Sequence, residues 1–190
     1  MSSRSPLAQA AETLARADAA IDRTFAPHRK DPLVRTVGLI SEVSDQPQLR
    51  WISAACIAAG LLGSSKRLAR AGMRMLLAHE LATMTKNFMK DEVDRTRPRS
   101  AQSMRDRKPK RGRSSAKEET SFPSGHTAGA VAVARAFSRE FPEYEAPALG
   151  LAALVAAAQV PRCAHYLSDV GAGALVGLSA EAASNLVWQA

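Results

Sequence analysis

The chain has 190 residues, which suits a single domain with a sizeable core. Its net charge of +8 and pI of about 10.1 suit an acidic partner: an anionic lipid, a phosphorylated substrate or a nucleic acid. The two cysteines, Cys56 and Cys163, lack metal-ligand spacing, and a disulfide between them is allowed by number alone.

Aromatic residues make up only 5% of the chain, and the hydrophobic residues are mostly alanine and leucine. Because strand-type alternation is scarce, we predict an all-α protein, a bundle of about six helices with its site at one end. Two units are expected: an N-terminal amphipathic helix over residues 1–30 and a single helical domain over residues 31–190. The first 30 residues contain no apolar core of a signal peptide.

The N-terminal helix is predicted to begin at Ser5-Pro6. Apolar residues then recur at helical spacing, with charged residues between them, at Leu7, Leu14, Ile21 and Phe25. Two interpretations stay open: the helix lies in a membrane interface, or it packs on the rest of the bundle.

Further helices are predicted in chain order after a connector over residues 31–50, which carries one short helix. An uncharged, mostly apolar run covers residues 51–63, and a long helix follows over residues 71–97. The later helices are expected to begin after His126, at Ala148 and at Val170. Three glycines in the last of these, Gly171, Gly173 and Gly177, have the spacing of a close helix contact.

Residues 99–119 form a segment of a different kind, with eight Lys or Arg, three acidic residues and almost nothing apolar. We predict a mobile basic loop at the mouth of the site that attracts anionic headgroups. Nucleic-acid binding is an alternative, but no aromatic residues are interleaved, so no nucleic-acid partner is expected. A solvated linker without a role is the other alternative.

Membrane insertion is predicted on mixed signals. No apolar run reaches the 18 or so residues of an unambiguous span, and the mean hydropathy is −0.17. However, uncharged runs alternate with charged loops, and Trp51 and Trp188 lie at run ends as interface anchors do. We expect a multi-pass protein of a bacterial-type inner membrane, with a soluble bundle as the alternative and the side of the site left open.

The first candidate site motif is Lys90 to Pro98, in which Lys90 and Arg97 lie seven residues apart. If both are helical, this spacing puts the two cations on nearly the same face, where they bind an oxyanion. A solvated, mixed-charge helix end is the alternative interpretation.

The second motif is Pro123-Ser124-Gly125-His126, which we interpret as a loop leading directly into a helix. Ser124 is a good N-cap, and Gly125 allows a ligand to approach the backbone. The free N–H groups of the helix start favour a phosphate, and His126 adds a side chain that exchanges a proton near neutral pH.

The third motif is His165 to Asp169. If this segment is helical, His165 and Asp169 face the same side, and the carboxylate orients the imidazole as a nucleophile or base. A polar pair at a loop-to-helix junction is the alternative.

Together, in this order, the three motifs resemble the type 2 phosphatidic acid phosphatase superfamily, which includes bacterial lipid phosphatases and the vanadium haloperoxidases. The resemblance covers roughly residues 50 to 185. It implies metal-independent hydrolysis of an anionic phosphorylated lipid at a membrane, without a cofactor, through a phosphohistidine intermediate. In the roles that it implies, His165 is the nucleophile, Asp169 orients it and His126 is the general acid and base.

The same resemblance assigns phosphate binding to Lys90, Arg97, Ser124 and the backbone of Gly125. One position departs from the family pattern, because Gln159 stands where the family has an arginine. Arg162 is therefore a hypothetical replacement ligand. The departure also leaves open a weakened or inactive site, while a lipid phosphotransferase and a haloperoxidase are further alternatives.

Overall fold

Seven α-helices make up most of the computed structural model, which describes residues 6–189. The prediction of an all-α bundle is confirmed, with seven helices where about six were expected. The helices are α1 (Pro6–Phe25), α2 (Pro32–Ser41), α3 (Gln46–Leu62), α4 (Lys66–Glu92), α5 (Gly125–Glu140), α6 (Glu145–Ala158) and α7 (Leu167–Gln189).

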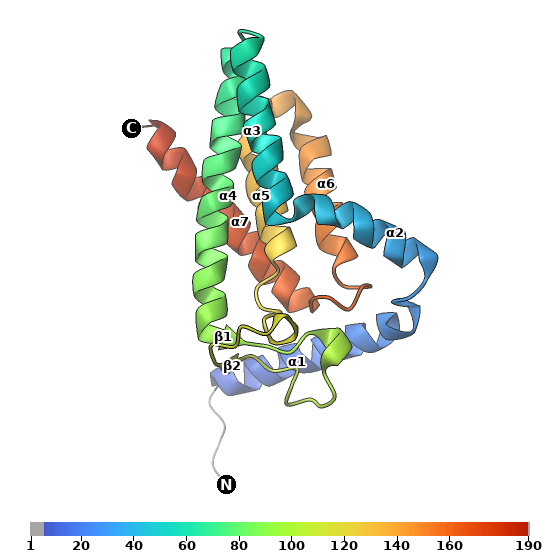
Figure 1. Cartoon of the computed structure of the whole chain (residues 1–190). Coiled ribbons are helices and arrows are strands. Elements are labelled where there is room, and N and C mark those ends of the chain that lie inside the picture. Colours follow the sequence, from blue (N-terminus) through green and yellow to red (C-terminus); the bar gives the residue numbers. More distant parts are fainter. Residues whose placement is uncertain (1–5, 190) are drawn as a thin grey trace.

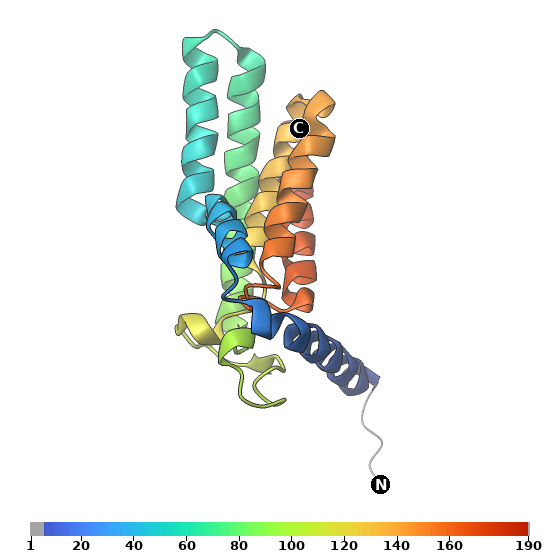
Figure 2. The same ribbon diagram turned by 90° about the vertical axis from the view of Figure 1, so that its right-hand side faces the viewer.

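The bundle is built around α4, α5 and α7, which pack on one another, with α3 against α4 and α6 against α5 (Figure 1). Figure 2 shows the α3–α4 hairpin on one side of the bundle and α5, α6 and α7 on the other. Helix α1 does not run along the bundle but lies across its lower end, close to the chain that joins α4 to α5. This end is therefore covered by two segments that are far apart in sequence.

Small side chains let the central helices approach closely. Buried alanines are spaced four or seven residues apart on one face of α4 and four residues apart on one face of α5, so each helix presents a face with little side chain. These alanines are Ala71, Ala78 and Ala82 of α4 and Ala128, Ala132 and Ala136 of α5.

Two of the three glycines expected to mark a close contact do so. A Cβ atom on Gly173 would lie 2.5 Å from the Ser124 carbonyl oxygen, and one on Gly177 would lie 2.6 Å from that of Ala128. A Cβ atom on Gly171, by contrast, would meet nothing within 4 Å among the described residues. Gly173 thus brings α7 against the loop of the second motif.

Alanine at position 173 is expected to lower the free energy of unfolding by about 1–3 kcal/mol, because α7 or the Ser124 loop must move to admit the methyl group. Gly171→Ala is the matched control, since it adds the same atom to the same helix in open space. Thermal unfolding of both variants in detergent measures the difference. Equal melting temperatures for the two would contradict this packing.

The long helix ends earlier than predicted. α4 stops at Glu92, and β1 (Val93–Asp94) then pairs antiparallel with β2 (Lys110–Arg111). The backbone becomes extended because Val93 and Asp94 enter this short ladder, and Arg97 also has an extended conformation. The prediction that Lys90 and Arg97 share a helix face is therefore wrong.

The basic loop over residues 99–119 makes defined contacts with α1. Arg107 Nη1 lies 2.5 Å from Asp22 Oδ2, and Lys108 Nζ lies 3.9 Å from Glu12 Oε2. Within the loop, Arg99 donates hydrogen bonds to the Glu118 carboxylate. These contacts hold the loop beneath the bundle end, and its mobility stays a prediction.

Helix α1 buries a face that its apolar pattern does not identify. The buried side chains are Ala15, Asp18, Ala19 and Asp22, which follow helical spacing, whereas Leu14 is 52% exposed. Of the two interpretations, packing on the bundle end is the one that the contacts of this face support, and small and acidic residues make these contacts.

Candidate active site

The second motif forms a loop that leads into α5, as predicted. Ser124 is the N-cap of α5, and its Oγ atom accepts a hydrogen bond from the Thr127 N–H. The Ser124 N–H donates to the Asp169 carbonyl oxygen over 3.0 Å, which ties the loop to the start of α7. The start of α5 is therefore held in place from two sides, with Gly125 and His126 on its first turn.

His165 lies in the loop before α7 and is 2% exposed. Its Nδ1 atom is 2.7 Å from the Ser121 carbonyl oxygen. Because a carbonyl only accepts hydrogen bonds, Nδ1 must carry the proton and Nε2 the lone pair. The imidazole is thus oriented as a nucleophile by a backbone group.

The direct partnership predicted between His165 and Asp169 is replaced by an indirect one. α7 begins at Leu167, so helical spacing does not apply to the pair, and Nδ1 of His165 is 3.9 Å from Asp169 Oδ2. Asp169 instead accepts hydrogen bonds from Ser121 Oγ over 2.7 Å and from the Tyr166 N–H over 3.0 Å. Asp169 therefore positions Ser121, and the backbone carbonyl of Ser121 in turn orients the His165 ring.

Arg95 connects this carboxylate to the N-terminal helix. Its Nη1 atom donates to Asp169 Oδ1 over 2.5 Å, and its Nη2 atom donates to Asp18 Oδ2 over 2.7 Å. The guanidinium also lies 4.0 Å from the centroid of the Tyr166 ring. All three charged side chains are at most 2% exposed. We call the set of Asp18, Arg95 and Asp169 the buried carboxylate clamp.

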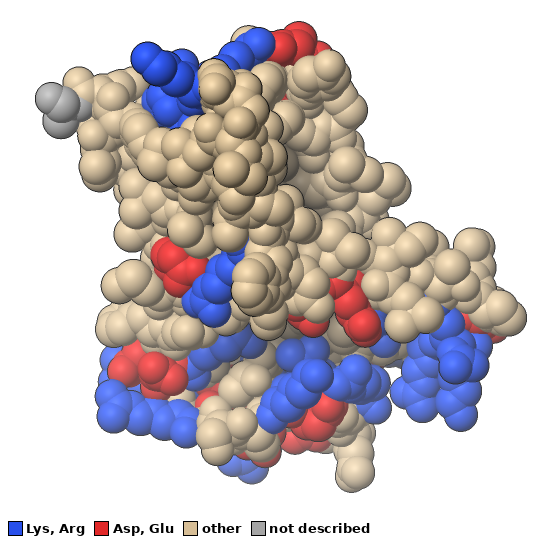
Figure 3. Space-filling model, turned by 45° about the horizontal axis from the view of Figure 1, so that its top comes forward, with Lys and Arg blue, Asp and Glu red and all other residues tan. Residues whose placement is uncertain are grey.

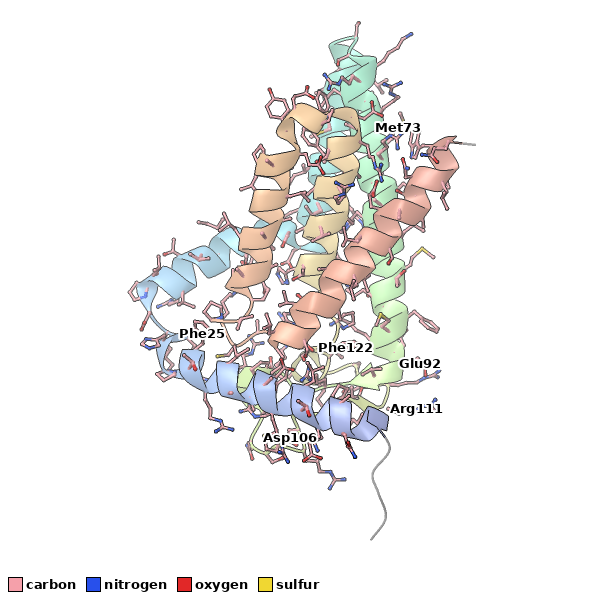
Figure 4. The ribbon with its side chains drawn as sticks, turned by 180° about the vertical axis from the view of Figure 1, so that it is seen from behind. Phe25, Met73, Glu92, Asp106, Arg111 and Phe122 are labelled. Carbon is pink, nitrogen blue, oxygen red and sulfur yellow. The ribbon has the colours of Figure 1, made fainter. Side chains whose placement is uncertain are left out.

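The surroundings of the clamp are visible from behind. Phe122 lies between the lower ends of α7 and α1, and it shares a cavity wall with Arg95 and Ser168 (Figure 4). The Ser168 N–H donates to Asp18 Oδ1 over 3.1 Å, so α1 also caps the first turn of α7.

His126 faces the other side of the site. Its Nε2 atom lies 2.8 Å from Asp45 Oδ1, just before α3. The ring centroids of His126 and His165 are 6.5 Å apart. Two histidines at this separation leave room for one phosphoryl group between them.

A polar cavity of about 230 Å³ joins these groups. Lys90 and Arg97 both line it, although one comes from α4 and the other from an extended segment. Lys90 Nζ donates to the Thr120 carbonyl, and Arg97 donates to the carbonyls of Lys117 and Ala164. The full lining comprises Glu42, Ser44, Asp45, Gln46, Lys86, Lys90, Arg97, Arg99, Lys117, Gly125, His126, Gln159, Arg162, Ala164 and His165.

Gln159, which stands where the family pattern has an arginine, and Arg162, its hypothetical replacement, both line the cavity. The Gln159 side chain is fully buried, and its Nε2 donates to the Val155 carbonyl over 3.0 Å. Arg162 donates to Ser41 Oγ over 2.7 Å and lies 3.3 Å from Glu42 Oε1. Arg162 is therefore at the cavity wall but is held by α2 and the turn that follows it.

The electrostatics of the cavity favour a neutral nucleophile. Burial, together with the charges of Arg97, Lys90 and His126, lowers the pKa of His165 well below its usual value. At the cavity rim, hydrogen bonds from Arg99 and Ser100 lower the pKa of Glu118 to about 2, so this carboxylate stays ionised. A neutral imidazole among cations is suited to attack on a phosphorus atom.

Several functional contacts were not foreseen from the sequence. Asp45 and Lys86 line the cavity, and Asp18 completes the clamp. Only Asp18 left a signal, because it belongs with Asp22 to a helical stripe of small and acidic residues. Asp45 lies in a predicted connector, and Lys86 is one of many charged residues on α4.

Comparison with known proteins agrees with this fold. The family model described as the PAP2 superfamily matches residues 71–190. No curated protein matches the chain significantly. The fold is similar to the crystal structure of a transmembrane PAP2 type phosphatidylglycerolphosphate phosphatase from Bacillus subtilis, with a TM-score of 0.69 and 22% identity over 98% of this chain and 88% of that one. Because the family model covers more than half of the chain, the protein belongs to the PAP2 superfamily.

Proposed function

We propose that this protein is a membrane-bound lipid phosphatase that acts through a phosphohistidine intermediate on a lipid phosphate monoester or an isoprenyl diphosphate. The observation that carries the proposal is the buried His165 ring, which lines a cationic cavity and donates Nδ1–H to a carbonyl. Family membership supports phosphatase activity in general.

In the first step, Nε2 of His165 forms a bond to phosphorus and the bond from phosphorus to the leaving oxygen breaks. Protonated His126, beside Asp45, gives its proton to that oxygen. Lys90 and Arg97 neutralise the charge that builds on the non-bridging oxygens. The Ser124 hydroxyl and the Gly125 N–H are the proposed hydrogen-bond donors to those oxygens.

In the second step, neutral His126 takes a proton from a water molecule. The water oxygen bonds to phosphorus, the phosphorus–nitrogen bond breaks, and inorganic phosphate leaves. His165 returns to its starting form, with the proton still on Nδ1 and its lone pair on Nε2. Every group in both steps is a side chain or backbone group of this chain, or the water.

A lipid substrate is favoured by a second, apolar cavity of about 460 Å³ between α3, α5 and α6. Its walls include Ile52, Val133 and Leu151. Ser44 lines both cavities, so the apolar cavity lies next to the cavity that holds the two histidines. A substrate with its phosphate beside His165 has a place there for a hydrocarbon chain.

A membrane location is supported by the surface of the bundle. On the face shown in Figure 3, charged side chains gather toward the two ends of the bundle, with a broad belt of uncharged residues between them. Large apolar side chains such as Leu62, Leu154 and Leu186 are at least 65% exposed. Among the described residues, α7 is the one helix that is long and apolar enough to cross a membrane. We propose a multi-pass protein of a bacterial-type inner membrane.

The test is phosphate release from phosphatidic acid and from an isoprenyl diphosphate, in detergent with EDTA. Rapid quenching with substrate labelled at its terminal phosphate should trap an acid-labile, base-stable phosphoprotein, as expected for phosphohistidine. Release that persists in EDTA together with this trapped species supports the proposal. Release that EDTA abolishes, or turnover without any trapped phosphoprotein, would overturn the mechanism.

The pKa of His165 gives a prediction for pH. The neutral ring is the nucleophile, and because its pKa is lowered, protonation removes it only well below pH 6.5. Nitrogen NMR of the folded protein should therefore show no titration of His165 between pH 8 and pH 6.5. The chain in denaturant is the control, since its histidines titrate near 6.5. A midpoint at or above 6.5 in the folded protein would contradict the assignment.

A further inference from the structure

Among the described residues, one buried cation of the polar cavity makes no hydrogen bond or ion pair. Lys86 lies on α4, four residues before Lys90, and only 7% of its surface is exposed. Within residues 6–189, no carboxylate or carbonyl oxygen lies within hydrogen-bond or ion-pair distance of its Nζ atom. Lys90 and Arg97, in the same cavity, both donate to backbone carbonyls.

The ammonium group of a largely buried side chain has lost much of its water, and no hydrogen bond or ion pair within the described residues compensates for that loss. The backbone opposite makes room for this side chain. A Cβ atom on Gly125 would lie 3.0 Å from Lys86 Cδ and 3.5 Å from its Nζ atom. Lys86 therefore reaches into the cavity across the first turn of α5, where a ligand of opposite charge would complete it.

The position of Lys86 is on the His126 side of the cavity. Gly125, which it contacts, directly precedes His126, and Asp45 lines the same wall. The nucleophile has other cations close by, since Arg97 and Lys90 act on the ring of His165. Arg97 and Lys90 thus lie near the nucleophile, and Lys86 lies beside the residue that precedes the proposed proton donor.

We propose that Lys86 is a further phosphate-binding residue, whose ammonium group binds an anionic oxygen on the leaving-group side of the substrate. This inference rests on the proposed function and deepens it. In a phosphate monoester, the oxygen bound by Lys86 belongs to the transferred phosphoryl group. In a diphosphate, it belongs to the phosphate that leaves with the isoprenyl chain. Lys86 also gives the cavity a positive charge, which is missing at position 159 because Gln159 replaces the arginine of the family pattern.

The decisive variant is Lys86→Met, which keeps most of the stem and removes the charge. We expect it to lower kcat/KM by 10- to 100-fold, as the loss of a hydrogen bond to a charged group implies. Inhibition by inorganic phosphate should weaken by a similar factor. Lys86→Arg, which retains the charge, should lose less than Lys86→Met in both measurements.

Lys66→Met is the matched control, because it makes the same change in the exposed first turn of the same helix. It should stay within twofold of the native chain in both measurements. Circular dichroism and melting temperature of Lys86→Met establish that the variant is folded. Loss confined to the isoprenyl diphosphate would assign the contact to the second phosphate, and loss on both substrates would assign it to the transferred group.

Two outcomes would overturn the inference while leaving the proposed function intact. One is an active native chain in which Lys86→Met changes neither kcat/KM nor phosphate inhibition by more than twofold. The other is a rise of more than tenfold in native activity on Gln159→Arg, which would mean that the cavity lacks the charge assigned to Lys86.

If the native chain releases no phosphate from any substrate, the proposed function fails, and calorimetric binding of inorganic phosphate to Lys86→Met and Lys66→Met still decides the role of Lys86.

Discussion

Alanine in place of His165 is expected to lower phosphate release by about 10⁴-fold or more, because the group that bonds to phosphorus is absent. Enzymes that lose their nucleophile retain only what binding and charge stabilisation contribute. The trapped phosphoprotein should disappear together with the turnover. The side chain is 2% exposed and does not carry a charge at neutral pH, so its removal leaves no buried ion without a partner.

The measurement is single-turnover phosphate release from detergent micelles, with the melting temperature recorded for each variant. His28→Ala serves as the matched control, since His28 is an exposed histidine that does not line the cavity and that hydrogen-bonds to Asp31. It should keep native activity. Turnover by a folded His165→Ala variant at more than a tenth of the native rate would assign the nucleophile elsewhere.

Methionine in place of Arg95 is expected to lower the free energy of unfolding by about 3–5 kcal/mol, the usual cost of removing one partner from a buried ion pair. The substitution leaves Asp18 and Asp169 buried, each without its cation. Activity should fall as well, because Asp169 positions Ser121, and the Ser121 carbonyl orients His165. This effect on rate acts through position alone, since Arg95 does not line the polar cavity that holds the two histidines and does not touch the proposed substrate.

Arg113→Met is the control for this variant, because Arg113 pairs with Glu92 at an exposed position where 79% of its side chain is accessible. It should change the melting temperature by little. The double variant Arg95→Met with Asp18→Asn should recover part of the lost stability, because one of the two unpaired carboxylates is neutralised. An unchanged melting temperature for Arg95→Met would mean that the buried carboxylate clamp does not hold the bundle end together.

Much of the fold follows from local pattern, and the departures have identifiable physical causes. Ser124 and Gly125 make a helix start from short-range chemistry alone, so the loop-to-helix prediction is confirmed. The end of α4 depends instead on Val93, which pairs with Arg111 far along the chain. Helical periodicity carries no information about such a partner, and the end of this helix was therefore predicted at residue 97 instead of Glu92.

The sequence predicted which residues form the site better than it predicted how they are arranged. The structure brings Lys90, Arg97, His126 and His165 to one cavity, as the three motifs indicated. Their hydrogen-bond partners are mostly backbone carbonyls, such as that of Ser121, and a backbone group has no signature in sequence. Asp45 illustrates the same limit, because a carboxylate in a connector is indistinguishable from a solvated one until the fold is known.

The placement of α1 has a consequence for the order in which the protein assembles during synthesis. Asp18 leaves the ribosome early, yet the Ser168 N–H that it binds lies 150 positions later in the chain. Until Arg95 and Arg107 have been made, Asp18 and Asp22 on the buried face of α1 lack their ion-pair partners, and the contact with Ser168 forms only after α7 has been made. Contacts of such long sequence separation form late in folding. The bundle end that holds the two histidines is therefore completed last, and a nascent chain that stalls before Ser168 lacks a finished site.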